Sequence, residues 1–141
     1  MTLAIIPARY NSTRFPGKPL ADMAGKTMIQ RVYERVASTE EIDDVVVATD
    51  DDRIYDHVLS FGGQVKMTRK DHQSGTDRVA EVAKLFPQAK VIVNVQGDEP
   101  FIDPRQIAAV VAPFENVQVA ITTLARPITE EGDMFSPNVV K

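Results

Sequence analysis

The sequence predicts an α/β fold in which helices cover both faces of a doubly wound, mainly parallel sheet. Short runs of apolar strand-forming residues alternate with segments of helical periodicity, which is the order that strand-helix-strand units produce. The 141 residues contain no internal repeat or low-complexity linker, and 43% of them are hydrophobic. We therefore expect residues 1–141 to form a single domain with its own core.

The first half of the chain should supply three strands and two helices. The apolar run 3–6 is too short for a helix and predicts a buried strand, which we expect Pro7 to end because proline cannot donate to a ladder. Thr27 is a suitable N-cap for the first helix. The elements expected after that strand are a helix over 28–38, a strand over 45–49, a helix over 53–61 and a strand over 64–67. Asp50, Asp51 and Asp52 could bind a metal, but their place before a helix favours capping.

The second half continues the alternation. Thr76 is the expected N-cap of a helix over 77–86, and Asp103 with Pro104 suits the start of a helix that runs to residue 113. The strands expected here are the strongly apolar 91–96, a fifth strand over 117–124 and the opening of another at 138–141, with a short helix over 129–135.

Composition limits the possible classes of function. The formal net charge of -4 argues against general binding to nucleic acid or to a membrane surface. The chain has no cysteine, which excludes disulfides and thiolate metal sites. The first residues lack the basic region and the apolar length of a secretory signal, and no stretch is long enough to span a membrane. We expect a cytoplasmic protein.

Three cations lie in the loop after the first expected strand: Arg9, Arg14 and Lys18. Together with the polar side chains between them, and with Gly17 beside Lys18, they could hold a polyphosphate. By themselves they are more typical of a solvated basic loop, and only the other motifs of the chain favour a phosphate site. The loop is not a P-loop, because Pro19 stands where that motif has a hydroxyl side chain.

Sheet topology predicts which loops meet. In the common strand order 3-2-1-4, the loops after Pro7 and Gln96 open into one crevice. Arg9 and Lys18 would then face Asp98 across it. Cations that bind phosphate, opposite a carboxylate that binds a metal, suit a nucleotide with magnesium. Magnesium takes one or two carboxylates plus phosphate oxygens as ligands. The alternative is that Asp98 belongs only to a turn, since Gly-Asp-Glu-Pro is also a good turn sequence.

Further polar residues precede the third expected helix. The loop over 73–77 could contact a base or ribose, although a helix entry is the simpler interpretation. His57 and His72 have no partner histidine at metal-ligand spacing. We interpret both as ordinary residues, with His72 the closer of the two to a ligand because it lies in a loop.

Four motifs together resemble one family. They are IPARYNSTRFPGKPL at 6–20, ATDD at 48–51, MTRKDHQSGTDR at 67–78 and NVQGDEP at 94–100. In this order they resemble the 3-deoxy-manno-octulosonate cytidylyltransferases, and the resemblance extends over the whole chain. It implies a Rossmann-like fold of the nucleotide-diphospho-sugar transferase type. It also implies that CTP and 3-deoxy-D-manno-octulosonate (Kdo) give CMP-Kdo and pyrophosphate for lipopolysaccharide biosynthesis, with magnesium (Mg2+) as cofactor and a homodimer as the full-length state.

The resemblance also implies roles for individual residues. Arg9, Arg14 and Lys18 match the triphosphate-binding loop, and Lys18 is the best candidate to stabilise charge on the α-phosphate. Asp98 matches a magnesium ligand, so the expected catalytic residues are Lys18, Arg9 and Asp98. Gln96 matches a residue near the Kdo sugar. The segment around the cytosine supplies the other expected substrate contacts, namely Arg69, Gln73, Ser74 and Gly75.

Members of this family are considerably longer than 141 residues. We therefore expect the domain to be incomplete at its C-terminal end and to lack a second aspartate ligand, much of the Kdo pocket and the dimer-forming segment. Two other functions remain open. One is activation of another acidic sugar such as sialic acid, or another sugar nucleotidyltransferase activity, and the other is nucleotide binding without turnover.

Overall fold

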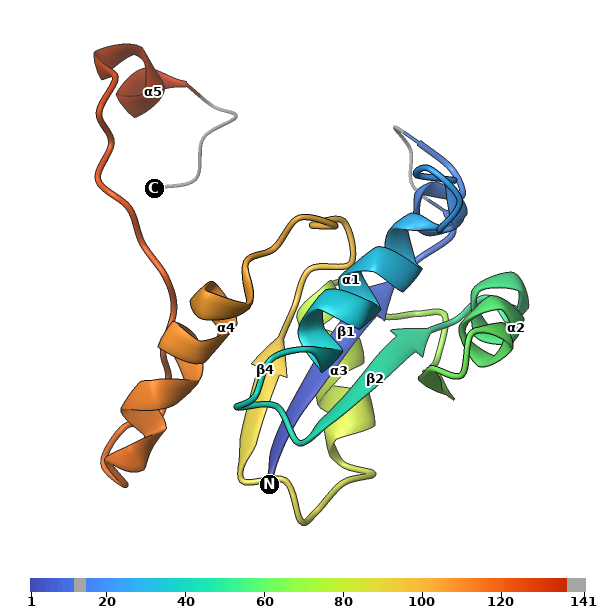
Figure 1. The fold of residues 1–141 in the computed structure, drawn as a ribbon, viewed down its shortest axis with the longest axis horizontal. Coiled ribbons are helices and arrows are strands. Elements are labelled where there is room, and N and C mark those ends of the chain that lie inside the picture. The colour runs from blue at the N-terminus through green and yellow to red at the C-terminus, as the bar shows by residue number, and fades with distance from the viewer. Residues whose placement is uncertain (12–14, 137–141) are drawn as a thin grey trace.

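A four-stranded parallel sheet lies at the centre of the computed structural model, which describes residues 1–11 and 15–136 (Figure 1). Its strand order is β3-β2-β1-β4, so the predicted order and direction are confirmed. The central strand β1 pairs with both neighbours, and Ile5 lies opposite Val46 on one side and Asn94 on the other. The strands are β1 (Thr2–Ala8), β2 (Asp44–Thr49), β3 (Gln64–Met67) and β4 (Val91–Asn94).

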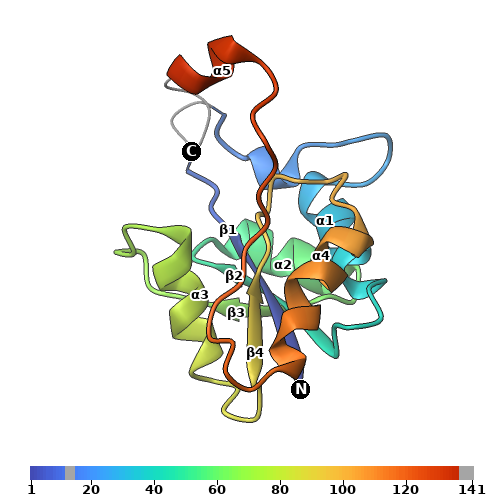
Figure 2. The same ribbon diagram turned by 90° about the vertical axis from the view of Figure 1, so that its left-hand side faces the viewer.

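Helices cover both faces of this sheet. Figure 2 shows α3 on one side and α1 and α4 on the other. The helices are α1 (Met28–Ala37), α2 (Asp52–Ser60), α3 (Gly75–Ala83), α4 (Pro104–Val111) and α5 (Glu131–Phe135), with 3-10 turns η1 (Lys18–Leu20) and η2 (Ala112–Glu115). No helix in the described part of the chain is long and apolar enough to cross a membrane.

The core has two layers because side chains alternate along each strand. Ala4 and Ile6 of β1 face α1, α2 and α4, where they meet buried residues such as Val32 and Ile107. Leu3 and Ile5 face the opposite way. They pack with Val46, Ala48, Val79 and Val82 in the layer that α3 covers. The two central strands β1 and β2 are thus covered on both faces, as is usual in a parallel sheet.

The sequence predicted that Pro7 ends the first strand. This prediction is wrong, since β1 continues to Ala8. The Ile5 carbonyl faces β4, where it accepts from the Val95 N–H at 3.1 Å. The backbone groups of Pro7, two residues later, face the same side. The ladder between β1 and β4 extends only as far as Ile5. The N–H that proline lacks is therefore not needed, and pairing with β2 continues past it.

The expected fifth strand is also wrong, since residues 117–124 form no strand among the described residues. A strand needs a neighbour that pairs with its backbone. This segment instead lies along α4 through side chains, and the Thr122 hydroxyl donates to the Val110 carbonyl at 2.8 Å. Val117 and Ile121 are almost fully exposed. The expected strand at 138–141 lies outside the described residues.

The helix ends largely follow the predicted capping. Thr27 caps α1, and its hydroxyl also contacts His57 Nε2 at 2.7 Å, which makes His57 a structural residue. Asp51 caps α2 as expected. The cap of α3 is Ser74 instead of Thr76, because Ser74 and Asp77 form a reciprocal capping box. Smaller differences are that β4 stops at Asn94 and that a 3-10 turn follows α4.

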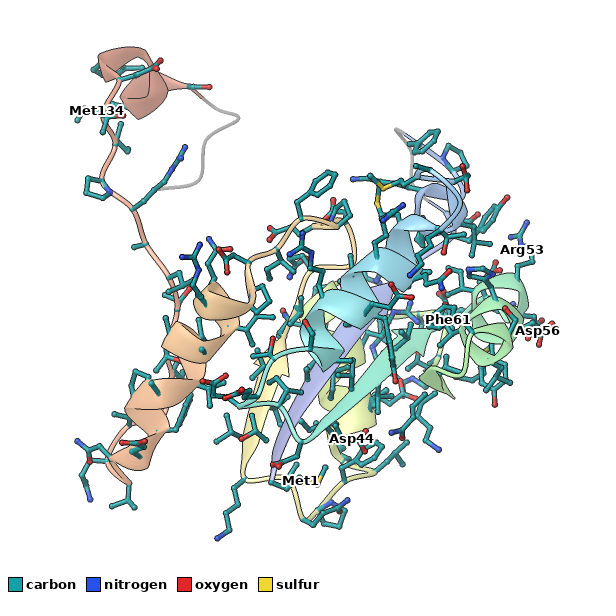
Figure 3. All side chains as sticks on the ribbon, in the orientation of Figure 1. Met1, Asp44, Arg53, Asp56, Phe61 and Met134 are labelled. Carbon is teal, nitrogen blue, oxygen red and sulfur yellow. The ribbon has the colours of Figure 1, made fainter. Side chains whose placement is uncertain are left out.

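All four strands end at the same edge of the sheet. Met1 and Asp44, labelled in Figure 3, mark the amino ends of β1 and β2 at one end of the molecule. Arg53, at the start of α2, lies at the opposite end, just beyond the carboxyl end of β2 (Figure 3). The loops after β1, β3 and β4 therefore gather at that edge, which is where open α/β sheets bind ligands.

Candidate active site

A cavity of about 610 Å³ lies at the carboxyl ends of β1 and β4. The loop after β1 forms one wall, the turn after β4 another, and the start of α3 a third. Seven residues that the sequence singled out line this cavity: Arg9, Lys18, Gln73, Ser74, Gly75, Gln96 and Asp98. The predicted crevice thus exists and joins segments from three parts of the chain.

Lys18 and Asp98 face each other within this cavity, as the topology predicted. Lys18 Nζ lies 2.7 Å from a carboxylate oxygen of Asp98, although 80 positions separate the two in sequence. Their side chains are 35% and 54% exposed. Both charges are therefore accessible to a ligand that enters the cavity.

Gly17 sets the position of Lys18. It has a φ of +74° and donates its N–H to the Tyr10 carbonyl at 2.8 Å, which closes the loop after β1. A Cβ at this position would lie 3.1 Å from the Tyr10 ring. The left-handed backbone and the close ring both favour glycine here. Lys18 then begins η1 and points its amine into the cavity.

Gly97 lets the turn after β4 approach β1 closely. A Cβ on Gly97 would lie 2.7 Å from the Pro7 carbonyl oxygen, too close for any side chain without a backbone shift. This close approach brings Gln96 and Asp98 to the cavity wall. The glycine of the VQGDEP motif thus has a steric reason that the sequence alone did not show.

The start of α3 is a rigid wall of the cavity. Ser74 Oγ donates to a carboxylate oxygen of Asp77 at 2.7 Å and accepts from the Asp77 N–H at 3.1 Å. The hydrogen bond from Ser74 holds the pKa of Asp77 below its ordinary value. Arg9, directly after β1, reaches toward this wall, and its guanidinium donates to the main-chain carbonyl of His72.

One predicted substrate-binding residue does not line the cavity, and the prediction for another stays untested. Arg69 is 70% exposed and pairs with Asp71 at 3.0 Å, outside the cavity lining. Arg14 lies outside the described residues. Of the three consecutive aspartates, Asp51 pairs with Arg53 and Asp50 pairs with the buried Arg78, so both have structural partners.

Asp98 is the carboxylate in the cavity lining that could hold a metal ion. Within residues 1–11 and 15–136, no group of three or more histidine, aspartate or glutamate side chains is close enough to hold an ion. Asp98 is a single accessible carboxylate beside a cationic loop. It fits a magnesium ion that takes most of its ligands from phosphates and water, and it does not fit an ion held by protein alone.

The structure also reveals residues that the sequence reasoning missed. Ser74 was not recognised as a cap, although the spacing of Ser74 and Asp77 is the sequence signature of a capping box. Pro7 and Phe15 line the cavity without having been predicted to do so. Glu81 and the buried Arg78 contact the loop before α3. No local pattern marks these two, because their partners lie in other elements.

Comparisons with known proteins place the chain in one family. A family model described as cytidylyltransferase matches residues 3–141. The 3-deoxy-manno-octulosonate cytidylyltransferases of Syntrophotalea carbinolica and Geobacter sulfurreducens are 59% and 58% identical over 139 residues, or 98% of this chain. The chain spans only 55% of the length of either relative.

A solved structure has the same fold. It is that of CMP:2-keto-3-deoxy-manno-octonic acid synthetase complexed with CTP, which is 43% identical to this chain with a TM-score of 0.75. The match covers 84% of this chain and 48% of the solved one. The likeness supports the arrangement of strands and helices that places the loops around the cavity.

Proposed function

We propose, given that this chain belongs to the cytidylyltransferase family, that it forms the nucleotide-binding part of an enzyme that makes CMP-Kdo. The substrates would be CTP and Kdo, and the second product pyrophosphate. The main structural support is that Arg9, Lys18 and Asp98 line one cavity, in which Lys18 Nζ lies 2.7 Å from Asp98. The names of the relatives and the CTP in the related solved structure support the choice of substrates.

Lys18 and Arg9 would bind the triphosphate. An exposed ion pair such as Lys18–Asp98 is worth at most about 1 kcal/mol, so Lys18 can exchange the carboxylate for a phosphate oxygen at little cost. The amine would then lie where negative charge increases on the α-phosphate during transfer. A cation fixed at that point stabilises the transition state more than the ground state.

Asp98 would hold magnesium together with the phosphates. Its carboxylate is a hard oxygen ligand, and a magnesium ion commonly takes one or two carboxylates besides phosphate oxygens and water. An ion bound there supplies positive charge that offsets the charge of the phosphate oxygens. Release of Asp98 from Lys18 would make the carboxylate available as the nucleotide arrives.

In the proposed reaction, the anomeric hydroxyl of Kdo loses its proton to water, and its oxygen bonds to the α-phosphorus of CTP. The bond from that phosphorus to the oxygen bridging the β-phosphate breaks, and pyrophosphate leaves with the electron pair. Gln96 lines the cavity beside Asp98 and is a candidate contact for the sugar. The contribution of this chain is to hold the phosphates and the sugar in line.

The start of α3 would recognise the base. Gln73 and Ser74 line the cavity with polar side chains, and Gly75 lines it next to the first turn of the helix. Polar groups that match cytosine would lose partners if another base entered, which disfavours that base. Arg69 would need to leave Asp71 to take part, so its role depends on a movement of its side chain.

Pyrophosphate release by the full-length protein that contains this chain tests the proposal. We expect release with CTP, Kdo and magnesium, and much less with ATP or UTP or with sialic acid in place of Kdo. Equal release with another acidic sugar would instead support a related sugar nucleotidyltransferase. CTP binding without release in the presence of any sugar would support a nucleotide-binding protein without turnover.

Two further parts of the proposal concern the whole protein. The homodimer implied by the family resemblance stays a prediction, which sedimentation of the full-length protein would test. Cytoplasmic localisation also stays a prediction, and cell fractionation would test it.

A further inference from the structure

Glu81 connects α3 to the loop that precedes it. One oxygen of its carboxylate, Oε2, accepts from the main-chain N–H of Arg69 at 3.3 Å and also contacts Nε2 of the His72 ring. The His72 side chain is only 10% exposed and that of Glu81 is 32% exposed. Since a carboxylate accepts hydrogen bonds, the His72 ring donates from Nε2. Glu81 therefore holds the loop over 68–74 at two points.

His72 extends this contact to the other side of the cavity. While its ring is held by Glu81, its main-chain carbonyl accepts from the guanidinium of Arg9. The Nε of Arg9 is buried and has no hydrogen-bond partner among the described residues. The direction of the Arg9 guanidinium thus depends on where the His72 carbonyl lies, and that depends on Glu81.

We propose that Glu81 is a positioning residue that fixes the base side and the phosphate side of the nucleotide site together. Gln73 and Ser74 line the cavity from the loop that Glu81 holds, and Arg9 lines it from the loop after β1. Glu81 itself is not among the lining residues and would act only through His72 and Arg69. The inference rests on the proposed function, because it assumes that CTP binds in this cavity.

Glu81 has little part in holding the fold together. The buried residues of α3 are Arg78, Val79 and Val82, whereas Glu81 is partly exposed beside the loop. The loop has no helix or strand of its own between Met67 and Gly75. Loss of the carboxylate should therefore loosen this loop and leave the sheet intact, as in a local opening.

Substitution in the full-length protein tests the inference. We expect Glu81→Ala to raise the KM for CTP about tenfold, which is the usual effect of losing a hydrogen bond to a charged group. It should also narrow the preference for CTP over UTP and leave kcat within about twofold, because no group that touches the reacting atoms is removed. Glu81→Gln keeps an acceptor oxygen of nearly the same position and should recover part of the loss.

Glu34→Ala is a matched control. Glu34 is also a helical glutamate in an ion pair, with Lys26 at 2.7 Å, and it is 43% exposed. It lies on α1, away from the cavity lining. We expect this variant to keep the wild-type KM and nucleotide preference.

Hydrogen exchange at the Arg69 amide provides a measurement that needs no nucleotide. We expect slow exchange in the wild type and faster exchange in Glu81→Ala. If Glu81→Ala and Glu81→Gln both keep the wild-type KM for CTP and the wild-type nucleotide preference while the wild type is active, the inference is wrong and the proposed function stands. If the wild type does not bind CTP, the proposed function and the inference are both wrong, whatever the exchange rates.

Discussion

Lys18 and Asp98 are the two side chains on which the proposed chemistry depends most. Their ion pair of 2.7 Å joins two partly exposed groups and so contributes at most about 1 kcal/mol to folding. A fixed charge beside a phosphoryl transition state is typically worth about 2–4 kcal/mol. Both residues should therefore matter for turnover much more than for stability.

We predict that Lys18→Ala and Asp98→Asn, each made in the full-length protein, lower kcat/KM by about 30- to 1000-fold. Thermal unfolding should change little. The matched control is Lys26→Ala, which removes an ion pair of the same 2.7 Å length to Glu34 on the surface. A Lys18→Ala enzyme with normal turnover would mean that the cations form only a solvated basic loop.

The helices that begin near the carboxyl edge of the sheet are stabilised by side chains at their first turns. Ser74 with Asp77 begins α3, and Asp103 with Gln106 begins α4, each as a reciprocal capping box. Such caps satisfy backbone N–H groups that have no partner within the helix. They also fix where the preceding loop turns, which decides how Ser74 and its neighbours face the cavity.

The cap of α3 can be tested by two neighbouring substitutions. We predict that Ser74→Ala lowers the free energy of unfolding by about 1 kcal/mol, because it removes the two hydrogen bonds that Ser74 Oγ makes with Asp77. Thr76→Ala should have a much smaller effect, since Thr76 lies inside the helix. Urea unfolding measures both. A larger loss for Thr76→Ala would place the cap where the sequence pattern suggested.

The cap of α4 should make stability depend on pH in acid. Hydrogen bonds from the Arg105 side chain and N–H lower the pKa of Asp103 from 3.8 to about 2. Because the folded pKa lies below the unfolded one, the contribution of Asp103 is present above pH 3.8 and is lost as pH falls toward 2. Urea midpoints measured over this range should fall less steeply in Asp103→Asn. Equal slopes for both proteins would contradict the prediction.

The molecule as a whole is joined at the carboxyl edge of its sheet by a buried cation. Arg78 of α3 is fully buried and pairs with Asp50 after β2 at 2.8 Å, and it also donates to the Thr68 hydroxyl after β3. It thus links a helix on one face to the ends of two strands. A buried charge of this kind costs desolvation energy, which only its partners offset.

We predict that Arg78→Met lowers the free energy of unfolding by about 3–5 kcal/mol, because it leaves the carboxylate of Asp50 without its partner. Arg78→Met combined with Asp50→Asn should lose less than Arg78→Met alone, since no unpaired charge remains. Urea unfolding of the single and double variants measures the difference. Equal losses would show that packing, and not the buried charge, dominates at this position.

Much of the fold follows from patterns among neighbouring residues. Apolar runs and caps such as Thr27 and Asp51 predicted the four strands and the four long helices that the structure contains, because capping and periodicity depend on residues within a few positions. The parallel order then followed from general rules of topology. The same rules predicted that Lys18 would face Asp98, and the structure confirms this placement.

Other features depend on contacts between residues far apart in the chain, which no local pattern records. Pro7 stays within β1 because the hydrogen-bonded ladder with β4 ends at Ile5. Residues 117–124 form no strand because they lack a pairing neighbour in the described structure. The roles of Arg78 and Glu81 arise only once α3 lies against the loop after β3. The folded arrangement alone makes a buried arginine a link between strands and a surface glutamate a support for Arg9.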